Sequence, residues 1–517
     1  MNLKKKVAAI VLIIVCLIIA IYYAHIGSLS AEQLKGALGT PKETIRVWYA
    51  DEALTDYMNS AAVSFQEAND IRVVPVLVSG LEYLDQINKV SLGKSEEAKD
   101  MPDVYIISND TLEKAYLAGL ASTVKDTEQI CTTDNYPQPA LDAVTYKDKM
   151  IAYPFYYETS MLLYNKTYMD VVAKSAIESE ADIAAAEEAQ AQIDAAVAEG
   201  TADQLVDEDG NLIATEEGTE AADVSQEEID QKIDTVIPKT IDDILTFANE
   251  YDAPEAVEAV FKWDVTDIFY NYFFVGKYMI VGGETGDNTE DIDIYNQNTI
   301  DCLKVYQNLN QFFSIDSEEV TYDSVLQDFI DGKTVFTVAT TDEIGKIEEA
   351  KKNGQFDFDY GVANVPDIND ELQTRSLSVT NAAVINGYSA KKEEANRFAT
   401  YLVKDHVNDL YNQAGKVASK LDVSYENPIV GDAMKEYRES IPMPKMIETS
   451  NYWVQLEIAF TKIWTGEDVN AELKQLSEQI MTQVTGAKYE EEEIVEPVEE
   501  QTEETESDFV EEETETP

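Results

Sequence analysis

The sequence predicts an α/β protein in which helices cover a parallel sheet, and three observations support this prediction. Apolar runs typical of buried strands occur at 44–49, 71–79 and 102–108. The stretches between them place apolar residues three and four positions apart, as one face of a helix does. The same alternation resumes after residue 240. Strands and helices in turn are the pattern of a parallel sheet with helices on its faces.

The first half of this pattern begins with the strand TIRVWY and continues with IRVVPVLVS and PDVYIIS. Each of these strands is followed by an apolar stripe at helical spacing. Gly119 is well placed to end the third helix, because glycine readily adopts the left-handed conformation found after a helix. The stripes consist of Leu54, Tyr57, Met58, Ala61, Ala62 and Phe65, then of Leu81, Leu84, Ile87 and Val90, and then of Leu112, Ala115 and Tyr116.

The second half contains further strand candidates at 333–339, 358–366 and 381–386. The run from Thr240 to Asp243 resembles a capping box at a helix start. Ser389 is the predicted N-cap of the helix that follows it. The ordered body is expected to end in two helices, whose stripes consist of Leu456, Ala459, Phe460 and Ile463, and then of Leu473, Leu476, Ile480 and Val484.

The charge of the chain is strongly negative and unevenly distributed. It has 38 Lys and Arg against 100 Asp and Glu, a formal net charge of −62. Residues 173–236 hold 19 acidic and 2 basic residues, and the tail after Lys488 holds 15 acidic and no basic ones. Phosphate binding needs clustered Lys and Arg, which occur only within the first six residues. Nucleic acid is therefore excluded as an expected partner.

The two acidic stretches are predicted to lie outside the folded core. The first half of 173–236 is rich in Ala and Glu and is strongly helix-forming, and Asp209-Gly210 suggests a hairpin. Part of a calcium-binding loop pattern falls on 207–216, but Leu205 stands at its first ligand position, so a solvated acidic insertion is the favoured interpretation. The tail 488–517 is predicted to be a disordered polyanion.

The N-terminus has the composition of an export or anchoring signal. Three lysines precede an uncharged run of 18 residues, Val7 to Ala24. As a helix this run spans ~27 Å, close to the ~30 Å hydrocarbon core of a bilayer. An uncleaved membrane helix within residues 1–28 is favoured over cleavage at 29–31. The basic flank stays inside, so the rest of the chain is expected at the outer face of the cell membrane.

Cysteine and histidine are too few for a predicted metal site. Cys16 falls in the apolar run, and Cys131 and Cys302 form no spacing pattern, which predicts two free thiols. His25 and His406 have no metal-ligand spacing with each other or with cysteine. We expect no cofactor and no metal.

The segment 146–166, YKDKMIAYPFYYETSMLLYNK, combines apolar runs typical of strands with residue types that bind ligands. Three consecutive aromatic residues and Glu158 stand between two apolar runs. Aromatic rings offer flat apolar faces to a sugar, and a carboxylate accepts hydrogen bonds from hydroxyls. Packing of these rings in the protein interior is an equally good explanation for each of them.

Six segments in order resemble the maltose-binding-protein-like solute-binding proteins of ABC transporters. They are IRVWYADEALTDYMNSAAVSFQEANDIRV, MPDVYIISNDTLEKAYLAGLASTV, the 146–166 segment, FIDGKTVFTVATTDE, FDYGVANVP and MPKMIETSNYW. The resemblance runs from about residue 44 to about 487, apart from the insertion. It implies a two-lobe α/β fold with a hinge and a ligand cleft between the lobes, with the chain first crossing at or just after 153–160.

The resemblance divides the chain into segments. Lobe 1 takes residues 44–156 and 371–425, and lobe 2 takes 157–370, including the insertion, and 426–487. The flanking apolar runs of the 146–166 segment are then strands of different lobes.

Carried over position by position, the resemblance implies seven ligand-binding residues. They are Asp51, Glu52, Asp110, Tyr156, Glu158, Tyr272 and Trp453. Two stacking tryptophans of the maltose-binding pattern are absent, because Ile107 and Asp342 stand at those positions. Maltodextrin itself is therefore not the expected ligand.

The resemblance implies an extracellular, monomeric receptor that closes around a small solute, a sugar or oligosaccharide, and delivers it to an ABC permease without chemistry. A cell-surface glycoside hydrolase, with Asp110 and Glu158 as its carboxylates, is the alternative from another class. A protein that keeps the cleft for sensing or scaffolding is a third.

Overall fold

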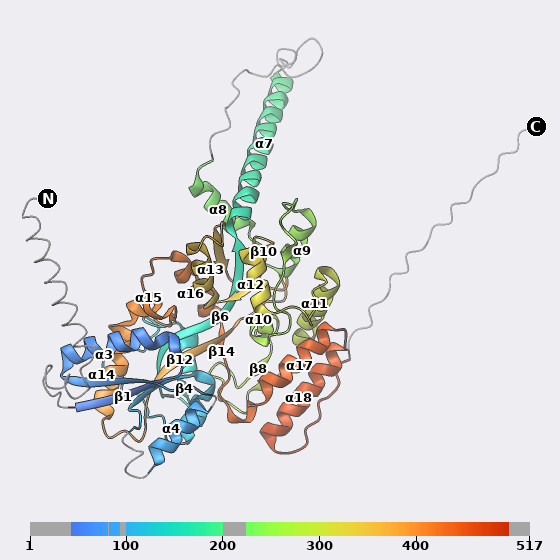
Figure 1. Cartoon of the computed structure of the whole chain (residues 1–517). Helices are drawn as coiled ribbons and strands as arrows, with labels where there is room; N and C mark the ends of the chain where they lie inside the picture. Colours follow the sequence, from blue (N-terminus) through green and yellow to red (C-terminus); the bar gives the residue numbers. More distant parts are fainter. Residues whose placement is uncertain (1–42, 81, 94–99, 200–223, 496–517) are drawn as a thin grey trace, which may run out of the picture.

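The computed structural model describes residues 43–495 except 81, 94–99 and 200–223 (Figure 1). The predicted membrane helix, the hairpin and calcium pattern within 205–216, and the tail from 496 onward lie outside the described residues. Within the described part of the chain, no helix combines the length and the apolar character needed to cross a bilayer.

The central sheet is mixed: the predicted parallel pairing is confirmed for β1, β2 and β3, but the later strand β12 is antiparallel to β3 and β6, and β6 is antiparallel to β10. Its strand order is β2-β1-β3-β12-β6-β10-β7. The strands are β1 (Glu43–Tyr49), β2 (Ile71–Leu77), β3 (Val104–Ser108), β4 (Thr145–Tyr146), β5 (Lys149–Met150), β6 (Tyr153–Asn165), β7 (Ala259–Phe261), β8 (Ile280–Val281), β9 (Ile292–Asp293), β10 (Thr334–Thr340), β11 (Tyr360–Ala363), β12 (Leu377–Ile385), β13 (Val417–Ala418) and β14 (Ile441–Pro442).

Strand β6 connects the two ends of this sheet. Its first part, through Thr159, pairs with β12, and from Ser160 onward it pairs with β10. β11 pairs with the end of β6 at 162–165. The three aromatic residues, Glu158 and the second apolar run thus form one continuous strand of 13 residues, whereas the first apolar run begins in β5 and lies before this strand. We call β1, β2, β3, β12 and the first part of β6 the first sheet region, and β7, β10, β11 and the rest of β6 the second.

Helices cover both faces of each region. In the first region, α3 and α14 bury Phe65 and Phe398 on one face, and Ile87 of α4 and Leu112 of α5 lie on the other. The helices are α3 (Thr55–Asn69), α4 (Tyr83–Leu92), α5 (Leu112–Leu117), α6 (Gln138–Ala143), α7 (Lys166–Glu199), α8 (Gln226–Val236), α9 (Ile241–Glu250), α10 (Ile268–Asn271), α11 (Gln297–Phe313), α12 (Tyr322–Ile330), α13 (Glu343–Lys352), α14 (Lys392–Lys404), α15 (Leu410–Ala414), α16 (Pro428–Glu439), α17 (Tyr452–Trp464) and α18 (Val469–Thr485).

The predicted caps are confirmed in part. Thr240 accepts the backbone N–H of Asp243 and completes a capping box at α9. Gly119, with φ +73°, follows the end of α5. Ser389 does not cap α14, which begins later; its hydroxyl instead donates to Asp103 at 2.6 Å. Cys131 and Cys302 are free thiols, as expected.

The insertion is only partly outside the core, which corrects its predicted limits. Helix α7 continues directly from β6 and projects away from the body (Figure 1). However, α8 packs beside the base of α7, and its Ile229 and Ile233 are buried in the core of the second region. Core residues therefore extend into the stretch that composition marks as solvated.

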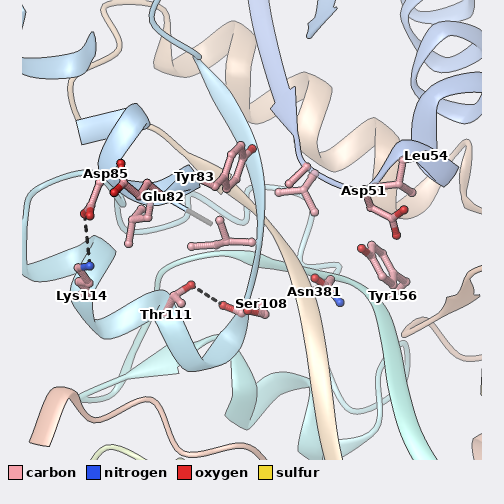
Figure 2. Close-up of a pocket in the computed structure, with 14 residues that line it drawn as sticks. Asp51, Leu54, Glu82, Tyr83, Asp85, Ser108, Thr111, Lys114, Tyr156 and Asn381 are labelled. Carbon is pink, nitrogen blue, oxygen red and sulfur yellow. Dashed lines mark hydrogen bonds and ion pairs between the residues drawn. The ribbon is translucent and has the colours of Figure 1, made fainter. Parts of the chain in front are cut away.

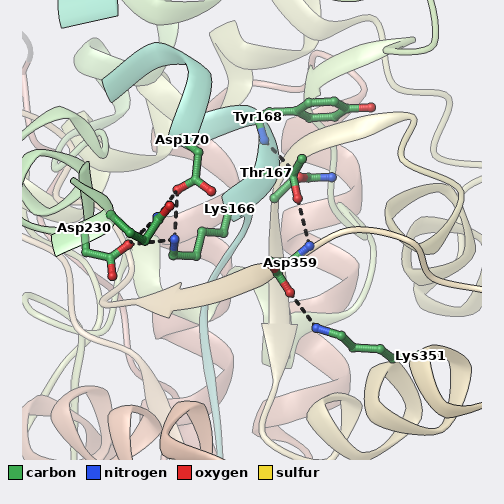
Figure 3. Close-up of polar contacts among 9 residues, drawn as sticks. Lys166, Thr167, Tyr168, Asp170, Asp230, Lys351 and Asp359 are labelled. Carbon is green, nitrogen blue, oxygen red and sulfur yellow. Dashed lines mark hydrogen bonds and ion pairs between the residues drawn. The ribbon is translucent and has the colours of Figure 1, made fainter. Parts of the chain in front are cut away.

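Polar contacts fix the base of α7 (Figure 3). The Lys166 ammonium lies 2.8 Å from Asp170 and 2.7 Å from Asp230 of α8. The Asp359 N–H, just before β11, donates to the Thr167 hydroxyl at 2.8 Å, and the Asp359 carboxylate pairs with Lys351 at 2.6 Å. These contacts fix the start of α7 next to the end of β6, which it follows directly.

The predicted start of the disordered tail at residue 488 is too early. The Ile494 N–H donates to the Tyr295 hydroxyl at 3.0 Å, and its carbonyl accepts from Asn470 at 2.9 Å. The Ser477 hydroxyl of α18 donates to Glu491 at 2.6 Å. Residues 488–495 therefore pack against the body of the protein, because the Ile494 backbone and the Glu491 side chain form hydrogen bonds with it.

Candidate functional site

A lysine that the sequence did not single out lies at the centre of the candidate site. The Lys416 ammonium is 3.1 Å from Asp51 and 3.4 Å from Glu158. Asp51 follows the end of β1, Glu158 lies on β6, and Lys416 stands between α15 and β13, after Gly415 in the left-handed conformation. Three segments that are distant in the sequence thus meet at one ion-paired group.

The three aromatic residues before Glu158 have different roles. Phe155 and Tyr157 are buried in the packed interior. The Tyr156 ring lies 5.6 Å from the Lys416 ammonium, close enough for a cation–π contact. Of the three, Tyr156 is the one that contacts the charged group, although it too is almost fully buried.

A cavity of about 350 Å³ opens beside Asp51 and Tyr156 in the first sheet region (Figure 2). It lies at the carboxyl ends of β1 and β3, where ligands commonly bind in open α/β sheets. Ile107, which stands where the maltose-binding pattern has a stacking tryptophan, lines this cavity. The lining residues are Ala50, Asp51, Leu54, Glu82, Tyr83, Leu84, Asp85, Ile106, Ile107, Ser108, Thr111, Lys114, Tyr156 and Asn381.

The second sheet region brings Asp342 to the same group. Its neighbour Thr341 donates its N–H to the Thr159 carbonyl at 3.2 Å and its hydroxyl to the Tyr157 carbonyl at 3.4 Å. These two bonds lie on either side of Glu158. Asp342, which stands where the maltose-binding pattern has an aromatic residue, thus places a second carboxylate next to Glu158.

Burial and charge shift the ionisation of these groups. Burial raises the pKa of the Glu158 carboxyl, the Lys416 ammonium opposes this, and the Asp342 and Asp51 charges add to it. Burial by itself lowers the pKa of Lys416, but Glu158 and Asp51 together outweigh it, so the net pKa is raised. The lysine therefore stays charged and holds the carboxylates near one another.

The other predicted residues lie around or apart from this group. Glu52 is exposed next to Asp51. Asp110 accepts the Ser108 hydroxyl, and burial raises its pKa. Tyr272 and Trp453 contact each other instead, with ring centroids 5.6 Å apart. Tyr272 is buried, and Trp453 is half-buried against the core of the second region.

Sequence reasoning missed Lys416 and the cavity residues Tyr83 and Asn381. No local pattern marks Lys416, because it becomes a partner of Glu158 only through the pairing of β13 with β6. Asn381 stands opposite Tyr156 on β12, which the strand register alone reveals.

The family model for bacterial extracellular solute-binding proteins matches residues 60–430. The chain belongs to this family. This family match confirms the resemblance drawn from the six segments. The family consists of extracellular binding proteins. A search of curated protein sequences found no match.

Solved structures share the fold of this solute-binding protein. An extracellular solute-binding protein from Staphylococcus aureus in complex with maltose has a TM-score of 0.63 at 17% identity, covering 86% of this chain and 98% of that one. A cyclo/maltodextrin-binding protein with maltotetraose has a TM-score of 0.62 at 17% identity, with coverages of 86% and 97%. A maltose-binding periplasmic protein from Listeria monocytogenes, with maltose, has a TM-score of 0.61 at 20% identity, with coverages of 87% and 100%.

Proposed function

We propose that this protein is the solute receptor of an ABC importer and that it closes around a small solute, a sugar or oligosaccharide. The observation that carries this proposal is the convergence of Asp51, Glu158 and Asp342 at Lys416, beside a cavity. The two sheet regions both contribute to this group. A ligand that contacts groups from both regions favours their approach, because its interaction energy is larger in the closed state.

The division into lobes follows the strand pairing. We propose that residues 44–159 and 371–425 form lobe 1 and that 160–370 and 426–487 form lobe 2. The first crossing then falls between Thr159 and Ser160, where β6 changes its partner from β12 to β10. The other crossings then fall near residues 371 and 426.

The solute lies in the cleft between these lobes. We assign Asp51, Glu52, Asp110, Tyr156 and Glu158 to its polar and aromatic contacts on lobe 1 and the first crossing. On lobe 2 the half-buried Trp453 presents its ring to the solute, and the buried Tyr272 supports that ring from the core, with ring centroids 5.6 Å apart. Stacking on a ring and hydrogen bonds to carboxylates are the usual means of holding a sugar.

The protein acts outside the cell as a monomer, tethered by the N-terminal membrane helix, and its partner is an ABC permease. No reaction takes place on it. The hydrolase alternative predicts that a bound oligosaccharide is cleaved during long incubation, whereas a receptor releases it intact. Intact-mass analysis of protein from membranes tests the tether, because a chain starting at Glu32 contradicts it.

A thermal-shift screen over sugars, oligosaccharides, polyols and amino acids tests the receptor proposal. A solute at 100 times its Kd adds about 2.7 kcal/mol to the free energy of unfolding. We expect a carbohydrate to raise the melting temperature and the Asp51→Asn and Glu158→Gln variants to lose this rise. No shift with any solute favours a sensing or scaffolding role and overturns the proposal.

A further inference from the structure

The candidate site contains more negative than positive charge. The Lys416 ammonium is shared by Asp51 and Glu158, and Asp342 stands next to Glu158. Two further lysines nearby are already engaged: Lys114 pairs with Asp85 at 3.3 Å, and Lys346 donates to the Tyr322 hydroxyl and lies 4.3 Å from that ring. An excess of carboxylate therefore remains around Lys416.

Closure makes this excess costly. When two lobes close on a solute, water leaves the carboxylates between them, and a buried carboxylate without a partner is strongly destabilising. A neutral sugar supplies hydroxyl donors but no charge. A solute with its own cation compensates the carboxylates as the water leaves, and an anionic solute adds to the repulsion.

The site already holds an ammonium group in the required surroundings. The Lys416 Nζ lies between two carboxylates and 5.6 Å from the Tyr156 ring centroid, the combination that recognises organic cations. Lys416 lies 3.1 Å from Asp51 and 3.4 Å from Glu158, so Glu158 is the more weakly paired of the two carboxylates. The bonds of Thr341 hold the neighbouring Asp342 beside Glu158, and the Asp342 charge acts on both Glu158 and Lys416. The Asp342 carboxylate accepts the Thr340 hydroxyl.

We propose that the solute carries a protonated amine, as an amino sugar does, and that Glu158 and Asp342 hold this amine while Lys416 stays on Asp51. This inference rests on the proposed function and specifies the chemistry of its ligand. Asp342 then replaces the stacking aromatic of the maltose-binding pattern with a charge, and the cavity of about 350 Å³, which Asp51, Tyr156 and Ile107 line, lies on the Asp51 side of this group.

A matched pair of sugars tests the inference by calorimetry at mildly acidic pH and low salt. The β-1,4-linked dimer of glucosamine carries the amines, and its N-acetylated counterpart has the same rings and linkage without the charge. We expect the amine form to bind roughly ten- to hundred-fold more tightly and to lose affinity as salt rises. The Asp342→Asn variant should lose this preference without a change in melting temperature.

The Asp359→Asn variant is the control, because its carboxylate pairs with Lys351 at the base of α7, away from the candidate site (Figure 3). Equal or tighter binding of the acetylated dimer, binding of maltose but of neither dimer, or an amine preference retained in Asp342→Asn each overturns the inference and leaves the receptor proposal standing. Stabilisation by calcium ions with no response to the amine overturns it as well. If no solute of any class binds, both proposals fail together.

Discussion

Tyr157 and Tyr437 stack face to face, with ring centroids 3.7 Å apart and an angle of 3° between the ring planes. Tyr157 lies on β6 just before that strand changes partners, and Tyr437 lies on α16. The Tyr437 hydroxyl also lies 2.6 Å from the Thr380 hydroxyl on β12. One buried aromatic pair thus joins the crossing strand, a helix and a neighbouring strand.

The Tyr437→Ala variant should lose about 3–5 kcal/mol of the free energy of unfolding, because it removes a fully buried ring and leaves a cavity. Tyr437→Phe keeps the ring and should lose about 0.5–1.5 kcal/mol through the missing hydroxyl. Denaturant unfolding measures both. Tyr388→Ala, at a ring that is 43% exposed, is the control and should change little. An alanine variant of Tyr437 as stable as this control contradicts the role of the stack.

Stability should fall as pH rises through the range in which Glu343 titrates. Burial, with a contribution from the Asp342 charge, raises the pKa of Glu343 to about 8, whereas an unfolded glutamate has a pKa of about 4.3. The folded state binds the extra proton between these values. Its stabilisation is fully present below the unfolded pKa and is lost as pH rises through the folded one.

The Glu343→Gln variant should remove this dependence. Glutamine can still accept the Thr340 N–H and contact the Tyr270 hydroxyl, which lie 2.8 and 3.0 Å from the carboxyl oxygens. Between mildly acidic and mildly alkaline pH, the wild type should lose on the order of a few kcal/mol more than the variant. Parallel pH profiles of the two proteins would show that Glu343 is ionised throughout.

Removing the outer part of the insertion should leave the fold intact. A deletion of 182–223 with a short linker keeps α8 and should shift the melting temperature by a few degrees at most. A deletion of 173–236 removes Ile229 and Ile233 from the core and should abolish cooperative unfolding.

Single substitutions separate the two parts of the insertion. Ile233→Ala, at a 2% exposed side chain, should cost about 2–5 kcal/mol, and Ile183→Ala, at a 57% exposed one, about 0.5 kcal/mol or less. Equal effects would show that α8 does not belong to the core.

Trp453→Ala and Glu158→Gln should each weaken solute binding roughly ten- to hundred-fold, since each removes one stacking or charge-assisted contact. Calorimetry measures the affinity of each variant, and thermal unfolding without solute shows whether the variant has also lost stability. Tyr272→Ala is the matched comparison: its ring is 1% exposed, so this variant should lose melting temperature strongly. Unchanged affinity in both Trp453→Ala and Glu158→Gln would place the solute elsewhere.

Local patterns in the sequence sufficed for much of the fold. The strands at 44–49 and 71–79, the capping box at Thr240 and the helix end at Gly119 were all predicted, and the structure has them. These features depend on residues a few positions apart, whose spacing and backbone preferences are visible without a fold. The family was recognised for a related reason, because six such segments follow one another in a characteristic order.

The tertiary structure alone decided which of these segments meet. Lys416 and Glu158 are 258 positions apart, and no spacing rule connects them. Their ion pair exists because β13 adds to β6, and β6 is continuous through a stretch that the sequence divides at its aromatic residues. Likewise, α8 is acidic enough to suggest solvent, yet two isoleucines on one of its faces are buried. Side-chain periodicity is a local property, whereas partner choice depends on strand register and packing across the whole chain.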